Sequence, residues 1–161
     1  SDELVVQRAY MDTHEGRLPI QDGIDVMTVG GVTFKRYLEI AKILNKETAV
    51  VTDNDGNIKA ITDKYKEYEG IPFIHICFDK VVDTGNLKLS DKNFNYNTLE
   101  PKILKENGRE VLNNIFGTDY NTDDEMHKYM HAHKTDCAIA IFESATKIKY
   151  PEYIMRALKN E

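Results

Sequence analysis

The chain has 161 residues, which fits one domain and is long enough to bury a hydrophobic core. Apolar residues make up 41% and charged residues 30%, a composition that is ordinary for a globular protein and excludes a disordered chain. The formal charge of −6 excludes the overall basic surface of many nucleic-acid-binding proteins, so an anionic partner must be bound by a local patch or through metal ions.

The first half of the chain alternates between predicted helices and strands. Apolar residues at helical spacing predict a helix over Glu3 to Met11. A short β-rich run covers Gly23 to Val29, and the two glycines after it predict a turn into a second helix, whose apolar periodicity runs from Phe34 to Leu44. The sequence TAVVTD, Thr48 to Asp53, is too apolar for a strand with a solvent face and predicts a central parallel strand covered on both sides.

The second half is mainly helical. A strand is predicted over Ile71 to Phe78 and is followed by a polar excursion at 79–97. Helical patterns then cover Leu99 to Asn107, Val111 to Phe116 and Asp123 to His133, and a last helix starts at Pro151. Strands that alternate with helices indicate an α/β domain with a mainly parallel sheet. We therefore expect one domain over 1–161, with a helical C-terminal part at 120–161.

Asp53 and Asp55 are predicted at the carboxyl end of the apolar strand, where functional groups collect in parallel sheets. Carboxylates this close repel each other, and a low-dielectric surrounding would raise the pKa of at least one of them unless a cation compensates. Hard oxygen ligands suit Mg²⁺ or Mn²⁺, so the pair indicates a divalent metal site. Gly56 lets the chain turn away from that site.

The motif DNDG has other interpretations. It can be a polar turn that closes a strand, because Asp, Asn and Gly are common turn residues. An EF-hand is excluded, since neither register places the loop glycine and the ligands correctly. The motif also resembles that of haloacid-dehalogenase-like phosphatases, in which Asp53 would be the nucleophile. However, Asn57 stands where that family usually has threonine or valine, and the later acidic pair, Asp123 and Asp124, follows no apolar strand.

Several stretches occur in a telling order: VMTVGGVTFKRYLEIAKIL (Val26 to Leu44), VVTDNDG (Val50 to Gly56), NTLEPKILKENG (Asn97 to Gly108), and HKTDCAIAIF with YPEYIMRAL (His133 to Phe142 and Tyr150 to Leu158). Together they resemble the C-terminal Toprim nuclease domain of OLD-family (overcoming lysogenization defect) proteins. These are ATP-dependent endonucleases, and the nuclease of the Gabija defence system belongs to the same group. The resemblance implies a Toprim-like α/β fold with a mainly parallel central sheet flanked by helices.

The resemblance also bears on the beginning of the chain. Such domains start with an apolar strand that ends in Glu-Gly-x-Ser-Asp/Glu, and Ser1 with Asp2 matches the last two positions. We therefore expect the first strand and its glutamate to lie just upstream of Ser1, unless Ser1 is a cloning remnant that matches by chance.

The resemblance assigns roles to four acidic residues. Asp53 and Asp55 match the Asp-x-Asp pair that holds a catalytic metal ion. Asp2 matches the acidic residue expected to serve a second ion. Glu100 matches a further acidic ligand, acting directly or through water, although a glutamate that merely begins a helix would look the same in sequence.

The implied activity is hydrolysis of DNA phosphodiesters with two Mg²⁺ or Mn²⁺ ions. Lys134 matches the lysine that stabilises the charge of the transition state, and Lys128 is the alternative candidate for this role. The implied partners are DNA and an N-terminal ATPase domain of the same protein, which these residues do not include; the wider basic surface would come from that domain or from a second protomer of a homodimer. The same resemblance suggests phage defence. No ATP site is expected in this chain, because the Walker pattern is absent. A catalytically silent regulatory or interaction domain is the alternative.

Other features indicate less. His127 and His131, with His133 and Cys137 nearby, resemble part of a zinc site, but exposed helical histidines need no ligand and no second cluster completes the set. Cys77 and Cys137 form no CxxC pair and are expected as buried, reduced thiols. No apolar run approaches the roughly 20 residues of a membrane span and no signal peptide opens the chain, so we expect a cytoplasmic protein without a membrane partner.

Overall fold

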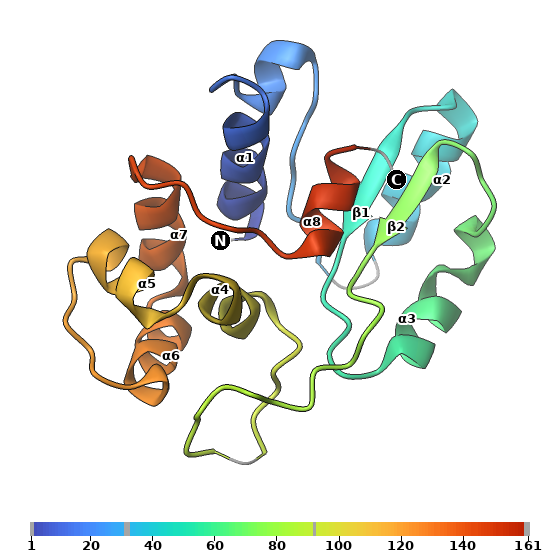
Figure 1. The fold of residues 1–161 in the computed structure, drawn as a ribbon. Coiled ribbons are helices and arrows are strands. Elements are labelled where there is room, and N and C mark those ends of the chain that lie inside the picture. The colour runs from blue at the N-terminus through green and yellow to red at the C-terminus, as the bar shows by residue number, and fades with distance from the viewer. Residues whose placement is uncertain (1, 31–32, 92, 160–161) are drawn as a thin grey trace.

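The computed structural model describes residues 2–30, 33–91 and 93–159, whose arrangement is shown in Figure 1. The strands are β1 (Thr48–Val51) and β2 (Ile74–Cys77), and short 3₁₀ turns are η1 (Pro19–Asp22) and η3 (Lys66–Tyr68). The helices are α1 (Asp2–Thr13), α2 (Phe34–Leu44), α3 (Ile58–Tyr65), α4 (Leu99–Asn107), α5 (Arg109–Phe116), α6 (Asp123–Ala132), α7 (Lys134–Glu143) and α8 (Glu152–Ala157). Ser1 and Gly31, which the sequence analysis used, lie outside the described residues.

The sheet consists of the parallel pair β1 and β2, which α3 connects. Val50 is opposite Ile76, and both pack on the side of α2 and α3, whereas Val51 packs on the side of α8. Figure 1 shows the pair between these helices. The chain is therefore α/β with a small parallel sheet flanked by helices, which confirms the predicted fold class.

Two expectations about strands are wrong. Gly23 to Val29 forms no strand, and its Ile24 and Met27 side chains are exposed. β1 is not a central strand either: helices lie on both of its faces, but within the described ranges its only ladder partner is β2, and Ala49 is exposed. Strand preference in a sequence is realised only where a neighbouring strand accepts the backbone hydrogen bonds, and in the described part of the chain no strand pairs with Gly23 to Val29.

Most predicted helices are confirmed, with α2 and α4 found at the expected residues. α3 and α7 were not predicted. α7 follows α6 directly, and the break is at His133, whose φ of −125° and ψ of 41° are not helical. α6 begins with a capping box in which the Thr122 side chain accepts from the Glu125 amide and the Glu125 carboxylate accepts in return, so its start is encoded locally.

Two hydrophobic clusters lie on the two sides of the sheet. The larger is formed by α1 and α4 to α8, and the smaller by α2, α3 and β2. The fully buried residues of the larger cluster include Leu112, Met126 and Ile154. Val51 of β1 packs against this larger cluster, so the end of the strand that precedes Asp53 is anchored in the helical part of the domain.

The segment 79–97 contains no helix or strand among its described residues, as predicted for a polar excursion. It is shaped instead by side chains that bond their own backbone: Asp79 accepts from the Val81 amide, Asp83 from the Gly85 amide and Asn95 from the Asn97 amide. No helix in the described part of the chain is long and apolar enough to cross a membrane.

Candidate metal centre

The turn between β1 and α3 carries Asp53 and Asp55 and is built around Asn54. Asn54 is fully buried, and its Nδ2 donates to the carbonyl oxygen of Asp79 at 2.7 Å. Its Oδ1 accepts from the amide of Gly56 at 2.9 Å, and Gly56 has a φ of 75°, a conformation that favours glycine. Because Asn54 points inward, the turn presents the carboxylates on either side of it at the carboxyl end of β1.

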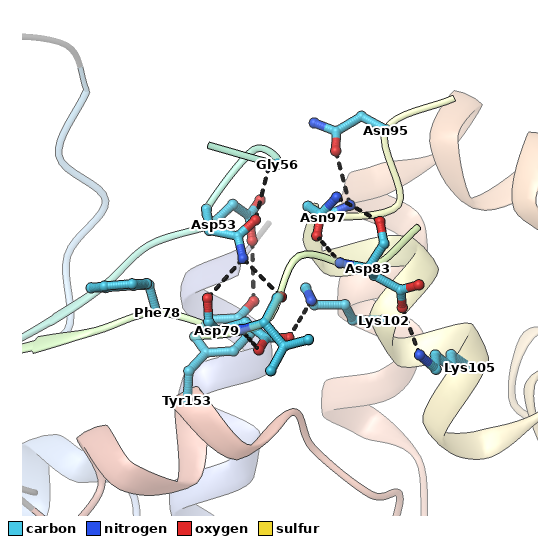
Figure 2. Close-up of polar contacts among 12 residues, drawn as sticks. Asp53, Gly56, Phe78, Asp79, Asp83, Asn95, Asn97, Lys102, Lys105 and Tyr153 are labelled. Carbon is cyan, nitrogen blue, oxygen red and sulfur yellow. Dashed lines mark hydrogen bonds and ion pairs between the residues drawn. The ribbon is translucent and has the colours of Figure 1, made fainter. Parts of the chain in front are cut away.

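The carboxylate of Asp53 has a raised pKa. Burial raises its pKa from 3.8 to about 6, a hydrogen bond from Tyr153 lowers it, and the nearby charges of Asp2, Asp55 and Glu100 raise it further. The Tyr153 hydroxyl donates to Asp53 Oδ1 at 3.1 Å (Figure 2). The leading influences on Asp53 thus include three other carboxylates, all of which the sequence had assigned to the same site.

These three carboxylates come from separate elements. Asp2 is exposed at the start of α1, and Asp55 is exposed in the turn, where it accepts from Asn95 Nδ2 at 3.3 Å. Glu100 lies in the first turn of α4 and is 9% exposed. The fold therefore brings the predicted acidic residues around Asp53 from positions far apart in the sequence.

Lys134 is the first residue of α7, and its Nζ lies 2.9 Å from Glu100 Oε1. Its rival, Lys128, lies on α6 and pairs with Asp124 at 2.7 Å. Of the two lysines, Lys134 is therefore the one that contacts a predicted member of the acidic cluster.

The sequence analysis missed Asp79 and Lys102. Asp79 follows β2 as Asp53 follows β1, because Val51 is opposite Cys77 in the parallel register. Its carboxylate forms an ion pair with the buried side chain of Lys102 (Figure 2). The signal for Asp79 was present, since the same rule that singled out the end of the first strand applies to the end of the second. Lys102, in the middle of α4, carries no such signal.

Tyr153 was missed as well. It is 3% exposed, on α8, and lines a cavity of about 340 Å³ together with Asp79, Lys102, Lys105 and Arg156. A tyrosine on a helix has no feature in the sequence that ties it to a carboxylate a hundred positions away. Only the packing of α8 against the strands brings the two together.

The alternative sites are not assembled. His127 is buried, contrary to the expectation of exposed helical histidines, and its ring packs edge-on against Phe94 at 4.1 Å between centroids. Burial raises the pKa of the Cys137 thiol to about 12, which disfavours the thiolate that zinc requires. The acidic pair needed by a phosphatase is engaged elsewhere: Asp123 pairs with Arg109 at 3.5 Å and Asp124 with Lys128.

The side chains around Asp53 offer the type of donor atom that a hard divalent cation prefers. The donors are carboxylate oxygens, and the pKa of Asp53 is raised first by burial and then by nearby negative charge, which a cation would offset. No three Asp, Glu, His or Cys side chains converge tightly enough to hold an ion by themselves within the described ranges. Mg²⁺ typically binds one or two carboxylates and completes its shell with water and substrate phosphate, so such a partial set fits this ion.

The comparison with known families supports one of these resemblances. Residues 1–55 match the family model described as "Overcoming lysogenization defect protein-like, TOPRIM domain". Residues 1–55 are therefore similar to an OLD-like Toprim domain. The match includes α1, α2, β1 and both aspartates of the turn, and it confirms the resemblance drawn from the sequence. No solved structure matches the chain significantly. Toprim domains generally bind divalent metals and occur in nucleases and primases, which indicates a metal-dependent enzyme of this broad kind that acts on nucleic acid.

Proposed function

We propose that this Toprim domain is the nuclease part of a larger ATPase–nuclease and hydrolyses DNA phosphodiesters with Mg²⁺ or Mn²⁺. The observation that carries the proposal is the environment of Asp53. Its half-buried carboxylate has a pKa raised to about 6 by burial and by Asp2, Asp55 and Glu100. Nearby carboxylates that raise the pKa of a buried one are a costly arrangement for a protein unless a cation is bound in function.

In this proposal Asp53 and Asp55 hold one ion, and Asp2 and Glu100 hold a second. Two bound divalent ions supply an activated water and a stabilised leaving oxygen for phosphodiester hydrolysis. The side chain of Lys134, which pairs with Glu100, is 43% exposed. Its ammonium group is therefore accessible to a bound DNA substrate and can contact an oxygen of the scissile phosphate. The protein thus contributes position and charge, and no nucleophilic side chain is required.

The wider assembly is part of the same proposal. With a formal charge of −6, this chain offers little general attraction for DNA, so we propose that the ATPase domain of the same protein or a second protomer supplies the basic surface. A DNA substrate agrees with the cytoplasmic location expected from the sequence, and a role in phage defence is part of the hypothesis.

The test is nicking of supercoiled plasmid by the full-length protein, with Mg²⁺, with Mn²⁺ and with chelator. Wild type should nick only with metal, and Asp53→Ala should lose this activity. Asp63→Ala is the matched control, because Asp63 is an exposed aspartate on the neighbouring α3 that pairs only with Lys59 among the described residues. Equal nicking by Asp53→Ala and wild type would show that the site is wrong. Hydrolysis of a small phosphate ester without any nicking would favour the phosphatase alternative.

A further inference from the structure

The hydroxyl of Tyr153 is placed where it controls the orientation of Asp53. It donates to Asp53 Oδ1 at 3.1 Å, and the tyrosine ring is 3% exposed (Figure 2). A buried ring is held by its neighbours and cannot swing away from the carboxylate, so the hydrogen bond fixes one oxygen of Asp53. The other oxygen, Oδ2, is then the one presented to an ion.

The helix that carries Tyr153 is itself fixed to the ends of both strands. One turn after Tyr153, Arg156 donates from a guanidinium nitrogen to the carbonyl oxygen of Phe78 at 2.6 Å, directly after β2. Tyr153 therefore contacts Asp53, two residues after the end of β1, and Arg156 contacts Phe78, directly after the end of β2. In Figure 1, α8 lies against the strand pair, as these two contacts require.

We infer that Tyr153 is a positioning residue for the metal ligand Asp53, holding its carboxylate in the orientation that binds the ion; this inference rests on the proposed function. Hydrogen bonds from a second layer of residues orient metal-binding side chains, and their loss commonly weakens metal affinity about 10- to 100-fold. Tyr153 does not touch the reacting atoms in this scheme and acts only through Asp53.

The same segment contains a matched control. Tyr150 also donates its hydroxyl to an aspartate, Asp12 Oδ2 at 2.6 Å, but this pair lies beside Arg8 in the helical part of the domain and not at the turn after β1. Tyr150→Phe and Tyr153→Phe thus each remove one tyrosine–aspartate hydrogen bond and keep the ring. If only Tyr153→Phe weakens metal binding, the effect comes from the hydrogen bond to Asp53 and not from the loss of a tyrosine–aspartate hydrogen bond in general.

The experiment is titration of the full-length, metal-free protein with Mn²⁺, followed by isothermal calorimetry and by the electron paramagnetic resonance signal of free Mn²⁺. Tyr153→Phe should weaken binding about 10- to 100-fold, and Tyr150→Phe should leave it unchanged. Wild-type affinity in Tyr153→Phe would overturn the inference, as would an equal loss in both variants. Asp53→Ala distinguishes failure of the inference from failure of the proposed function. If Asp53→Ala binds Mn²⁺ as tightly as wild type, or if wild type binds no Mn²⁺, the proposed metal site is wrong, and the inference about Tyr153 is wrong with it.

Discussion

The ammonium group of Lys134 lies 2.9 Å from the carboxylate of Glu100, so the first residue of α7 contacts the first turn of α4. The side chain of Glu100 is 11% exposed, whereas that of Lys134 is 43% exposed. The lysine is thus attached to the acidic cluster by one contact while its charge still faces solvent. This arrangement allows it to meet an anionic substrate.

Lys134→Ala should abolish most nuclease activity while leaving the fold intact. Loss of one group that stabilises transition-state charge typically costs about 10²- to 10³-fold in kcat. Because a partly exposed ion pair contributes only about 0–1 kcal/mol, the free energy of unfolding should change little. Plasmid-nicking rates and urea denaturation measure the two effects. Lys128→Ala is the control, and a loss of activity there but not in Lys134→Ala would assign the role to the rival lysine.

Asp53→Asn should stabilise the metal-free protein at neutral pH. Since the pKa of Asp53 is raised from 3.8 to about 6 on folding, the folded state binds this proton more tightly than the unfolded chain. The contribution of Asp53 to stability is therefore fully present at pH values below the unfolded pKa, falls as the pH rises toward the folded one, and stays low above it. A shift of about two units corresponds to about 3 kcal/mol at most.

Urea denaturation in the presence of chelator measures the effect of Asp53→Asn. It is carried out at one pH below the unfolded pKa of 3.8 and at one pH above the folded pKa of about 6. The free energy of unfolding of the variant should exceed that of wild type at the higher pH and equal it at the lower pH. A variant that is no more stable than wild type at neutral pH would contradict the raised pKa. Added Mn²⁺ should reverse the order, because the ion stabilises only the protein that keeps the carboxylate.

Arg8→Ala should be among the most destabilising substitutions in α1. Arg8 is 7% exposed, pairs with Asp12 at 3.0 Å, and donates to three carbonyl oxygens at the end of α7, those of Ile141, Phe142 and Ser144. Removing one partner of a buried ion pair costs about 3–5 kcal/mol, because the other charge is left uncompensated. Arg17→Ala is the comparison, because Arg17 pairs with Asp22 but its side chain is half exposed. Its loss of unfolding free energy should stay within about 1 kcal/mol. Similar losses of unfolding free energy in the two variants would argue against a role of Arg8 in joining α1 to α7.

Asn54→Asp should destabilise the turn that carries the site. It replaces the buried donor to the Asp79 carbonyl by an acceptor and places a third carboxylate beside Asp53 and Asp55. Leaving a buried group unsatisfied costs about 1–3 kcal/mol, and more for a charged one. Asn57→Asp, three residues later, should be nearly neutral, because Asn57 caps α3 by accepting from the Ala60 amide and aspartate caps equally well. Thermal unfolding of both variants tests this, and equal melting temperatures would refute the anchoring role of Asn54.

The position of the acidic turn could be predicted from the sequence because it depends on local patterns. An apolar run followed by Asp-x-Asp-Gly marks the end of a parallel strand, and β1 ends at Val51, two residues before Asp53. The start of α6 is equally local, since Thr122 and Glu125 form a capping box. Where a few neighbouring residues satisfy each other, the sequence predicts the structure well.

Contacts between distant segments could not be predicted in this way. Tyr153 reaches Asp53 only because α8 packs against both strands, and Lys102 reaches Asp79 only because α4 lies beside the end of β2. The strand expected at Gly23 to Val29 failed for the opposite reason, because strand-forming residues without a neighbouring strand stay in irregular structure. Lys134 and Glu100 were associated with the site by family resemblance alone, and the fold joins them.

The two cysteines have a practical consequence for measuring motions in this domain. Cys77 and Cys137 are both buried, and burial raises the pKa of each thiol, so neither should react readily with maleimide dyes in the folded protein at neutral pH. A single cysteine introduced at an exposed position, such as Asn95 in the loop beside Asp55 or His131 on α6, could therefore be labelled without removing either native thiol. Fluorescent reporters could then follow the loop and the helical part separately while metal or DNA is added.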